Sequence, residues 1–188
     1  MHLLTAEKLS VFRGERLVLN GISFSLGAGG MLVLRGANGA GKSTLLRALA
    51  GLTPCAAGAL LWDGVPVTAD RYAHAERVAW LGHLDAVKPM LTAAEHVPVA
   101  ALAQVGLEKF ADLPARLLSA GQKRRLAIAR VAAAGRVLWL LDEPTTGLDA
   151  ASLARFGALC AAHRAAGGMI VASTHTPLDA GDVQELGL

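Results

Sequence analysis

The sequence has 188 residues and is short of several features, each of which excludes a class of protein. Its two cysteines, Cys55 and Cys160, match no metal-type spacing, so they predict reduced packing thiols rather than a disulfide framework or metal site. The longest apolar run, residues 97–107, is far below the roughly 18 residues of a membrane-spanning helix. Aromatics make up only 4%, and one dense basic run occurs, at residues 123–125, which argues against a nucleic-acid partner.

What is present predicts one folded unit over residues 1–188. Hydrophobic residues make up 53% and charged residues 18%, so the chain can bury a proper core. Glu7 and Lys8 interrupt the N-terminus before any signal-like apolar stretch forms. We therefore expect the protein to start and stay in the cytosol unless a partner brings it to a membrane.

The apolar pattern predicts an α/β fold. Loose alternation over residues 11–26 indicates half-buried antiparallel strands. Continuous apolar runs at residues 31–34, 137–141 and 169–172 are typical of buried strands in the middle of a parallel sheet. Helices are expected from about Lys42, over residues 126–134 and over residues 152–166, and this alternation of strand and helix defines the class.

Residues 36–43 match the pattern G-x-x-x-x-G-K-[ST] between a predicted strand and a predicted helix. Backbone N–H groups of such a loop bind phosphates, while Lys42 can reach the β- and γ-phosphates and Ser43 can ligate Mg²⁺. An ordinary glycine-rich turn is the alternative, and the surrounding strand and helix disfavour it. The predicted ATP-binding residues here are Gly36, Ala37, Asn38, Gly39, Ala40, Gly41, Lys42, Ser43 and Thr44.

An acidic pair follows the apolar strand at residues 137–141. Asp142 at the carboxyl end of a central strand is expected to face the phosphate loop as a second magnesium ligand. The Glu143 side chain is expected to point in a different direction from that of Asp142. It can hold a water in line with the γ-phosphate as general base. A solvated acidic turn before Pro144 is the alternative, and the phosphate loop makes it weak.

Between these motifs stands Leu118-Ser119-Ala120-Gly121-Gln122, followed by a helix. A serine hydroxyl and a glycine N–H at a helix N-terminus can bind an anion, and a second anion site suggests a second nucleotide and a dimer. Ser119 is equally well explained as a helix N-cap. The residues alone leave both interpretations open.

The order of these motifs, with Gly147-Leu148-Asp149 and a final Ser173-Thr174-His175, resembles the ATP-binding cassette (ABC) ATPases over essentially the whole chain. The resemblance implies a P-loop NTPase with an N-terminal antiparallel β subdomain. It also implies a homodimer that sandwiches two ATP molecules, each phosphate loop facing the partner's residues 118–122. Asp149 would then communicate across the interface, and His175 would contact the γ-phosphate and the attacking water. Phe12 is similar to the family's adenine-stacking aromatic residue, and core packing is its alternative role.

Two departures from the family pattern concern the segment after residues 78–82. The family usually has glutamine where this chain has His83 and Leu84, and His83 can take the water-mediated contact to Mg²⁺. His83 and Ser119 are 36 positions apart, so the helical subdomain, at about residues 84–120, is expected to be about 15 residues shorter than in the family, or roughly four helical turns. That subdomain docks on membrane partners in the family.

Within the family, residues 58–62, 80–83, 101–107, 118–125 and 167–170 resemble the haem exporter ATPases of cytochrome c biogenesis. This resemblance implies integral membrane permease subunits, haem-handling proteins and a peripheral position on the cytoplasmic face of the inner membrane. The alternatives are the ATPase of another ABC exporter and a soluble ABC ATPase not coupled to transport. A phosphate-loop small-molecule kinase would have no use for residues 118–122.

Overall fold

The protein, described from a computed structural model that covers residues 2–174 and 183–188, contains two β-sheets. The first is antiparallel, with strand order β2-β1-β4-β5. The second is parallel, with order β6-β7-β8-β3-β9. The strand bounds are β1 Leu3–Arg13, β2 Arg16–Gly27, β3 Met31–Arg35, β4 Ala57–Trp62, β5 Val65–Pro66, β6 Val78–Leu81, β7 Leu138–Asp142, β8 Met169–Ser173 and β9 Gln184–Gly187.

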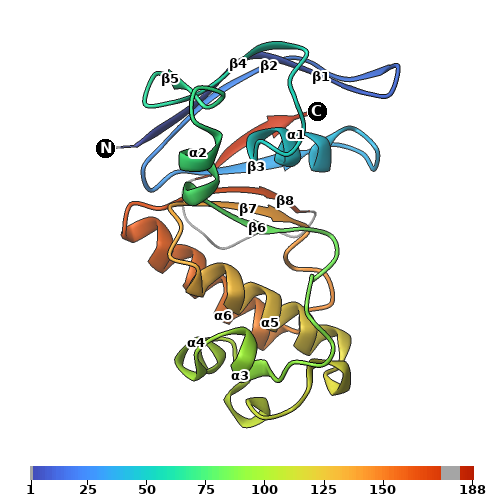
Figure 1. Ribbon diagram of the computed structural model, residues 1–188, viewed down its shortest axis with the longest axis vertical. Helices are drawn as coiled ribbons and strands as arrows, with labels where there is room; N and C mark the ends of the chain where they lie inside the picture. The colour runs from blue at the N-terminus through green and yellow to red at the C-terminus, as the bar shows by residue number, and fades with distance from the viewer. Residues whose placement is uncertain (1, 175–182) are drawn as a thin grey trace.

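Helices separate the two sheets and cover the far face of the parallel one (Figure 1). Helix α1 lies between the sheets, whereas α5 and α6 run across the opposite face of the parallel sheet. The helix bounds are α1 Lys42–Leu49, α2 Arg71–Arg77, α3 Ala93–His96, α4 Val99–Gln104, α5 Ala120–Ala133 and α6 Ala150–Ala165, with 3₁₀ turns η1 Glu108–Phe110 and η2 Ala115–Leu117.

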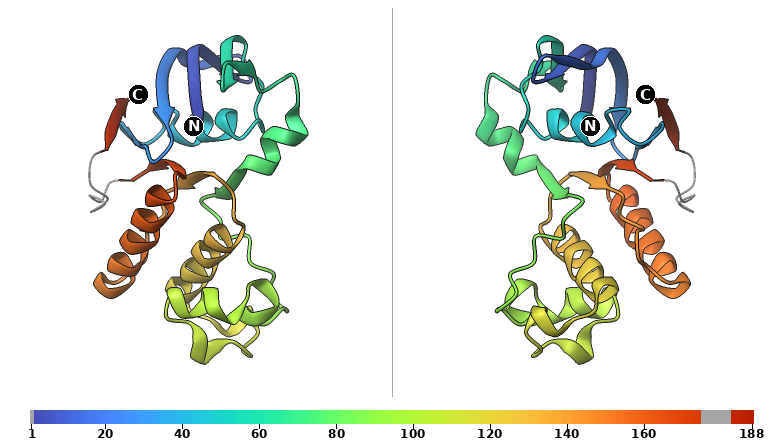
Figure 2. Two further views of the ribbon diagram at one scale, coloured as in Figure 1. Left: turned by 90° about the vertical axis from the view of Figure 1, so that its left-hand side faces the viewer. Right: turned by 90° about the vertical axis from the view of Figure 1, so that its right-hand side faces the viewer.

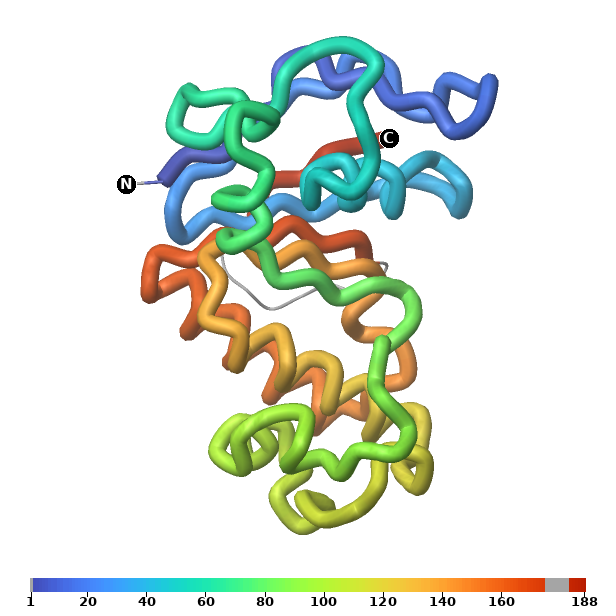
Figure 3. The backbone as a smooth tube through the Cα atoms, in the orientation of Figure 1, coloured from blue at the N-terminus to red at the C-terminus, as the bar shows by residue number. Residues whose placement is uncertain are grey.

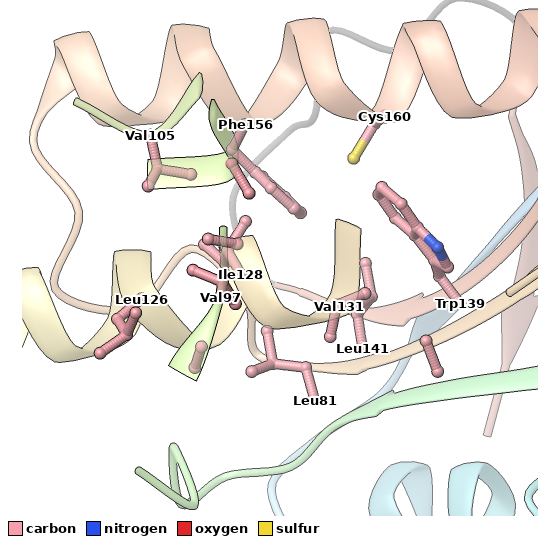
Figure 4. Packing of buried hydrophobic residues seen from close by; sticks show 14 of the residues in the cluster. Leu81, Val97, Val105, Leu126, Ile128, Val131, Trp139, Leu141, Phe156 and Cys160 are labelled. Atoms are coloured by element: carbon pink, nitrogen blue, oxygen red, sulfur yellow. The ribbon is translucent and has the colours of Figure 1, made fainter. Parts of the chain in front are cut away.

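The parallel sheet divides the apolar interior into two clusters, because successive strand residues point to opposite faces. In β7, Leu138 and Leu140 join a cluster with α1 and the antiparallel sheet, while Trp139 and Leu141 join one with α5 and α6. Figure 4 shows the second cluster, in which Phe156 and Cys160 of α6 face residues of α5. All five residues of β7 are buried, as the continuous apolar run predicts.

Residues 84–120 form a small unit at the far end of α5, away from the antiparallel sheet (Figure 2). The segment contains α3, α4 and two 3₁₀ turns, and an isolated bridge joins Thr92 to Pro114. A capping box between Thr92 and Glu95 starts α3. The predicted helical subdomain therefore corresponds here to two short helices that pack on α5.

Several elements differ from those expected from the sequence. Strand β1 begins at Leu3 rather than near Val11, since bulges around Glu7 disturb its alternation. Helix α5 begins at Ala120, before the apolar segment that starts at Leu126, which agrees with the interpretation of Ser119 as its N-cap, and its first turn is polar. Strands β4 and β9 were not predicted, and the latter returns beside β3 at the sheet edge (Figure 3).

Candidate active site

The phosphate loop joins the carboxyl end of β3 to the first turn of α1. Gly39 and Gly41 have φ angles of 84° and 109°, a region that glycine adopts without the penalty other residues incur. Gly41 is the N-cap of α1, and a Cβ there would lie 2.8 Å from Leu19. Lys42 is 8% exposed, and its Nζ donates to the Gly36 and Ala37 carbonyls at 2.7 and 3.1 Å. The ammonium is thus held within the loop that the sequence predicts to bind phosphates.

Asp142 ends β7 next to the end of β8, because the two strands pair in parallel register. The Ser173 hydroxyl donates to Asp142 Oδ1 at 2.7 Å, and Asp142 is 5% exposed. One carboxylate oxygen is therefore fixed by the neighbouring strand.

Glu143 adopts a left-handed backbone conformation with φ of 49°, which is uncommon outside glycine. Its N–H lies 3.0 Å from both the carbonyl and the hydroxyl oxygen of Ser173, and its carbonyl accepts from Arg124 at 2.6 Å. A residue kept in such a conformation costs on the order of 1–3 kcal/mol and clusters at functional sites. The backbone around Glu143 is thus held on both sides against its local preference.

Two adjoining cavities bring these segments together. One, of about 670 Å³, is lined by the phosphate loop, Asp142, Glu143 and His83; the other, of about 790 Å³, is lined by Phe12, Ser43, Asp142 and His83. Phe12 is 48% exposed, so its ring is available as a stacking surface rather than buried as core. Leu84 lines only the second cavity, whereas His83 lines both, which favours His83 for the position after β6.

Residues 118–122 form the start of α5. Ser119 is the N-cap: its Oγ accepts from the Gln122 N–H at 3.2 Å, and Gln122 Oε1 accepts from the Ser119 N–H at 2.8 Å. A Cβ on Gly121 would lie 3.0 Å from the Gly147 carbonyl, so the turn before α6 packs closely on this segment. The capping interpretation of Ser119 is therefore confirmed, and the anion-binding one stays a prediction.

Asp149 is the N-cap of α6, where its Oδ1 accepts from the Ser152 N–H at 2.8 Å. Hydrogen bonds from Ser152 lower the pKa of Asp149 below its ordinary value. Neither Asp149 nor any of residues 118–122 lines the two cavities, as expected if they act on a nucleotide bound by a second subunit. His175 lies outside the described residues.

Sequence reasoning missed three arginines. Arg13 and Arg16, at the β1–β2 turn, line the cavity that contains the phosphate loop. Arg124 was noted only as part of a basic run, yet it is 5% exposed and binds the loops that carry Asp142 and His83. Its position three residues before buried Ala127 places it on the inner face of α5, and this spacing is the signal that could have found it.

A phosphate loop facing an acidic pair across the carboxyl ends of a parallel sheet defines a nucleotide-binding protein of the P-loop class. The family model described as "ABC transporter" matches residues 19–146. The chain belongs to this family, which confirms the resemblance drawn from the motifs. It is the nucleotide-binding, ATP-hydrolysing subunit of a transporter that has membrane partners.

Several relatives share the printed name "Cytochrome c biogenesis ATP-binding export protein CcmA". The protein from Paramagnetospirillum magneticum is 49% identical, with 98% of this chain and 93% of that protein covered. The one from Gluconobacter oxydans is 50% identical, covering 94% and 82%. The one from Escherichia coli is 40% identical, covering 95% and 92%.

Solved structures agree with the fold. The structure described as "ATP binding subunit of ABC transporter" has a TM-score of 0.83 at 26% identity and covers 92% of this chain and 79% of that one. A bacterial Atm1-family ABC exporter with ATP bound has a TM-score of 0.87 at 22% identity, covering 99% of this chain and 36% of the exporter chain. The second match shows the fold alone.

Proposed function

We propose that this chain is the ATPase subunit of an ABC exporter of cytochrome c biogenesis, and that ATP hydrolysis supports haem delivery to, or release from, a haem chaperone. The observation that carries the proposal is a phosphate loop that shares a cavity with Asp142 and Glu143, in a chain 40–50% identical to proteins named for export in that process. Haem as cargo follows from the residue stretches that resemble haem exporter ATPases.

The nucleotide would bind with its phosphates on the loop of residues 36–44 and its adenine near Phe12. Lys42, whose Nζ donates to the Gly36 and Ala37 carbonyls of this loop, would bring its charge to the β- and γ-phosphates, and the α1 N-terminus would add N–H donors. Arg13 and Arg16 line the same cavity and add positive charge beside the phosphates. Binding therefore rests on charge and backbone donors that all converge on one cavity.

Ser43 and Asp142 supply a hydroxyl and a carboxylate oxygen on the same cavity, and oxygen donors suit Mg²⁺. Mg²⁺ bound there would neutralise charge on the phosphate oxygens. His83 would hold a water toward the same position. Glu143 would orient the attacking water and accept its proton, and His175 would contact the γ-phosphate and that water.

A homodimer would complete the site. Residues 118–122 and Asp149 lie outside the cavities of their own subunit, so they reach a nucleotide only if a second copy presents them. In that arrangement the Ser119 hydroxyl and the Gly121 N–H meet the γ-phosphate of the partner's ATP.

Membrane partners would dock on the segment of residues 84–120, which places the chain on the cytoplasmic face of the inner membrane. In the described residues, no helix combines the length and apolar character needed to cross a bilayer. The shortened docking subdomain is proposed from the spacing of the motifs, since His83 and Ser119 are 36 positions apart.

The test is complementation of a strain that lacks its own exporter ATPase, with c-type cytochromes measured by haem staining. The wild-type chain should restore them, whereas Lys42→Ala and Glu143→Gln should not. Tyr72→Ala, at a side chain that is 88% exposed on α2 and lines neither nucleotide cavity, is the matched control and should behave as wild type. Pull-down from mildly solubilised membranes should recover integral membrane subunits. Restoration by Lys42→Ala, or a wild-type chain recovered alone, would refute the proposal.

A further inference from the structure

Arg124 is a fully engaged buried guanidinium outside the motifs that bind the nucleotide. It lies on the second turn of α5, five residues after the N-cap Ser119, and its side chain is 6% exposed. A guanidinium has five N–H donors, and the structure gives Arg124 five acceptors. No other side chain can satisfy that number in this geometry, because lysine has only three donors.

Three of the acceptors belong to the last residue of β7 and the loop that follows it. Arg124 Nη2 donates to the carbonyls of Asp142 and Glu143 at 2.7 and 2.6 Å, and Nε donates to the Pro144 carbonyl at 3.3 Å. These bonds hold the peptide units on both sides of Glu143, whose backbone is in the left-handed region. Arg124 thus fixes the backbone of the proposed general base through these hydrogen bonds.

The other two acceptors belong to the loop that follows β6. Arg124 Nη1 donates to the Gly82 carbonyl at 3.0 Å and to Asp85 Oδ1 at 2.9 Å. The same loop carries His83 and is also held by Arg130, which donates to the Ala86 carbonyl at 2.7 Å. Asp85 lines neither nucleotide cavity. Its carboxylate therefore acts on the site through the hydrogen bond that it accepts from Arg124.

We infer that Arg124 is a positioning residue that couples the start of α5 and the loop of residues 82–86 to the backbone of Glu143. The inference rests on the proposed function, since it assigns a regulator to the same hydrolytic site. When residues 118–122 engage the partner's nucleotide, α5 is fixed, and Arg124 then holds Glu143 in its own subunit. When the loop of residues 82–86 moves, Gly82 and Asp85 move with it. Because Arg124 is hydrogen-bonded to both of them and to the Glu143 carbonyl, the backbone of Glu143 moves as well.

The test compares steady-state ATPase kinetics of the chain assembled with its membrane subunits. Arg124→Lys should lower kcat at least about tenfold and leave KM for ATP within about threefold, because the nucleotide-binding groups are untouched. Asp85→Asn keeps the acceptor oxygen and removes the charge, so it should lower kcat by about threefold at constant KM. Arg136→Lys is the matched control: its Nη1 donates to the Glu76 carbonyl at 2.6 Å, before β7 and at the opposite ends of the strands, and kcat should not change.

Coupling is measured by combining Arg124→Lys with Asp85→Asn. If Asp85 acts through Arg124, the double variant should have the kcat of Arg124→Lys alone. Multiplicative losses, or a folded Arg124→Lys with wild-type kcat, would overturn the inference while wild-type ATPase activity still supports the proposed function. If Arg124→Lys does not fold, an unchanged kcat in Asp85→Asn overturns it instead. A wild-type complex without ATPase activity would refute the proposed function itself.

Discussion

Ser119→Asp separates the two roles that Ser119 has at the start of α5. Aspartate caps helices as well as serine does, and its carboxylate can accept the Gln122 N–H that Ser119 Oγ accepts at 3.2 Å. We expect the free energy of unfolding to stay within about 0.5 kcal/mol of wild type, with any gain coming from negative charge at the helix N-terminus. By contrast, Ser119→Ala should cost about 1 kcal/mol because the cap is lost.

Although Ser119→Asp should keep the stability of the monomer, it should prevent formation of the dimer. A carboxylate about 4 Å from a phosphate oxygen repels it by about 4 kcal/mol at an effective dielectric constant of about 20, roughly a thousandfold in affinity per site. The assay is size-exclusion chromatography with light scattering in saturating MgATP, in the Glu143→Gln background that should trap the dimer. Ser119→Asp should remain monomeric with wild-type stability.

Thr92→Ala is the control for capping, because Thr92 and Glu95 form the equivalent capping box of α3. It should lose stability as Ser119→Ala does and still dimerise. If Ser119→Asp dimerises like its parent, residues 118–122 only cap a helix. That result would contradict the proposed homodimer, in which these residues contact the partner's ATP.

Three further predictions concern the core beside α6. Gly168→Ala should destabilise the fold by about 2 kcal/mol in urea titration, since its Cβ would overlap the His163 ring that stacks on Trp139 at 3.9 Å; unchanged stability would refute the contact. Phe156→Ala, at 2% exposure, should cost about 3–5 kcal/mol, and a loss below about 1 kcal/mol would contradict its burial. Burial lowers the pKa of His163, so the unfolded state takes up a proton first as pH falls below about 6.5, and stability falls with it. His163→Gln should therefore flatten the dependence of unfolding free energy on pH between about 5 and 7, and an unchanged slope would exclude His163 as its source.

The elements nearest the chemistry were predictable because two independent signals agree there. The phosphate-loop pattern lies between an apolar run and a helix, and the structure places Lys42 at the first position of α1. The run that ends at Asp142 is buried on both faces, and parallel pairing brings that residue beside Ser173. In these places local pattern and tertiary packing require the same conformation.

Prediction failed where tertiary contacts, rather than local pattern, decide the structure. Strand β9, with the sequence Gln-Glu-Leu-Gly, has no buried residue and forms only by pairing with β3. Strand β4 contains Gly58, whose Cβ would overlap the backbone of Glu7 and Lys8, so it depends on the bulge in β1. Neither segment has a periodic apolar pattern of its own.

Helix α5 links the segment of residues 84–120, which we propose docks on membrane partners, to the proposed hydrolytic site. Its N-cap is the predicted contact to the partner's nucleotide, and Arg124 on its second turn holds the loops that carry Glu143 and His83. Arg125 Nη1 donates to the Val105 and Gly106 carbonyls at 3.1 and 3.2 Å, which fixes the end of α4. One helix therefore connects the proposed dimer contact, the loops that carry Glu143 and His83, and the end of α4 within the proposed docking segment.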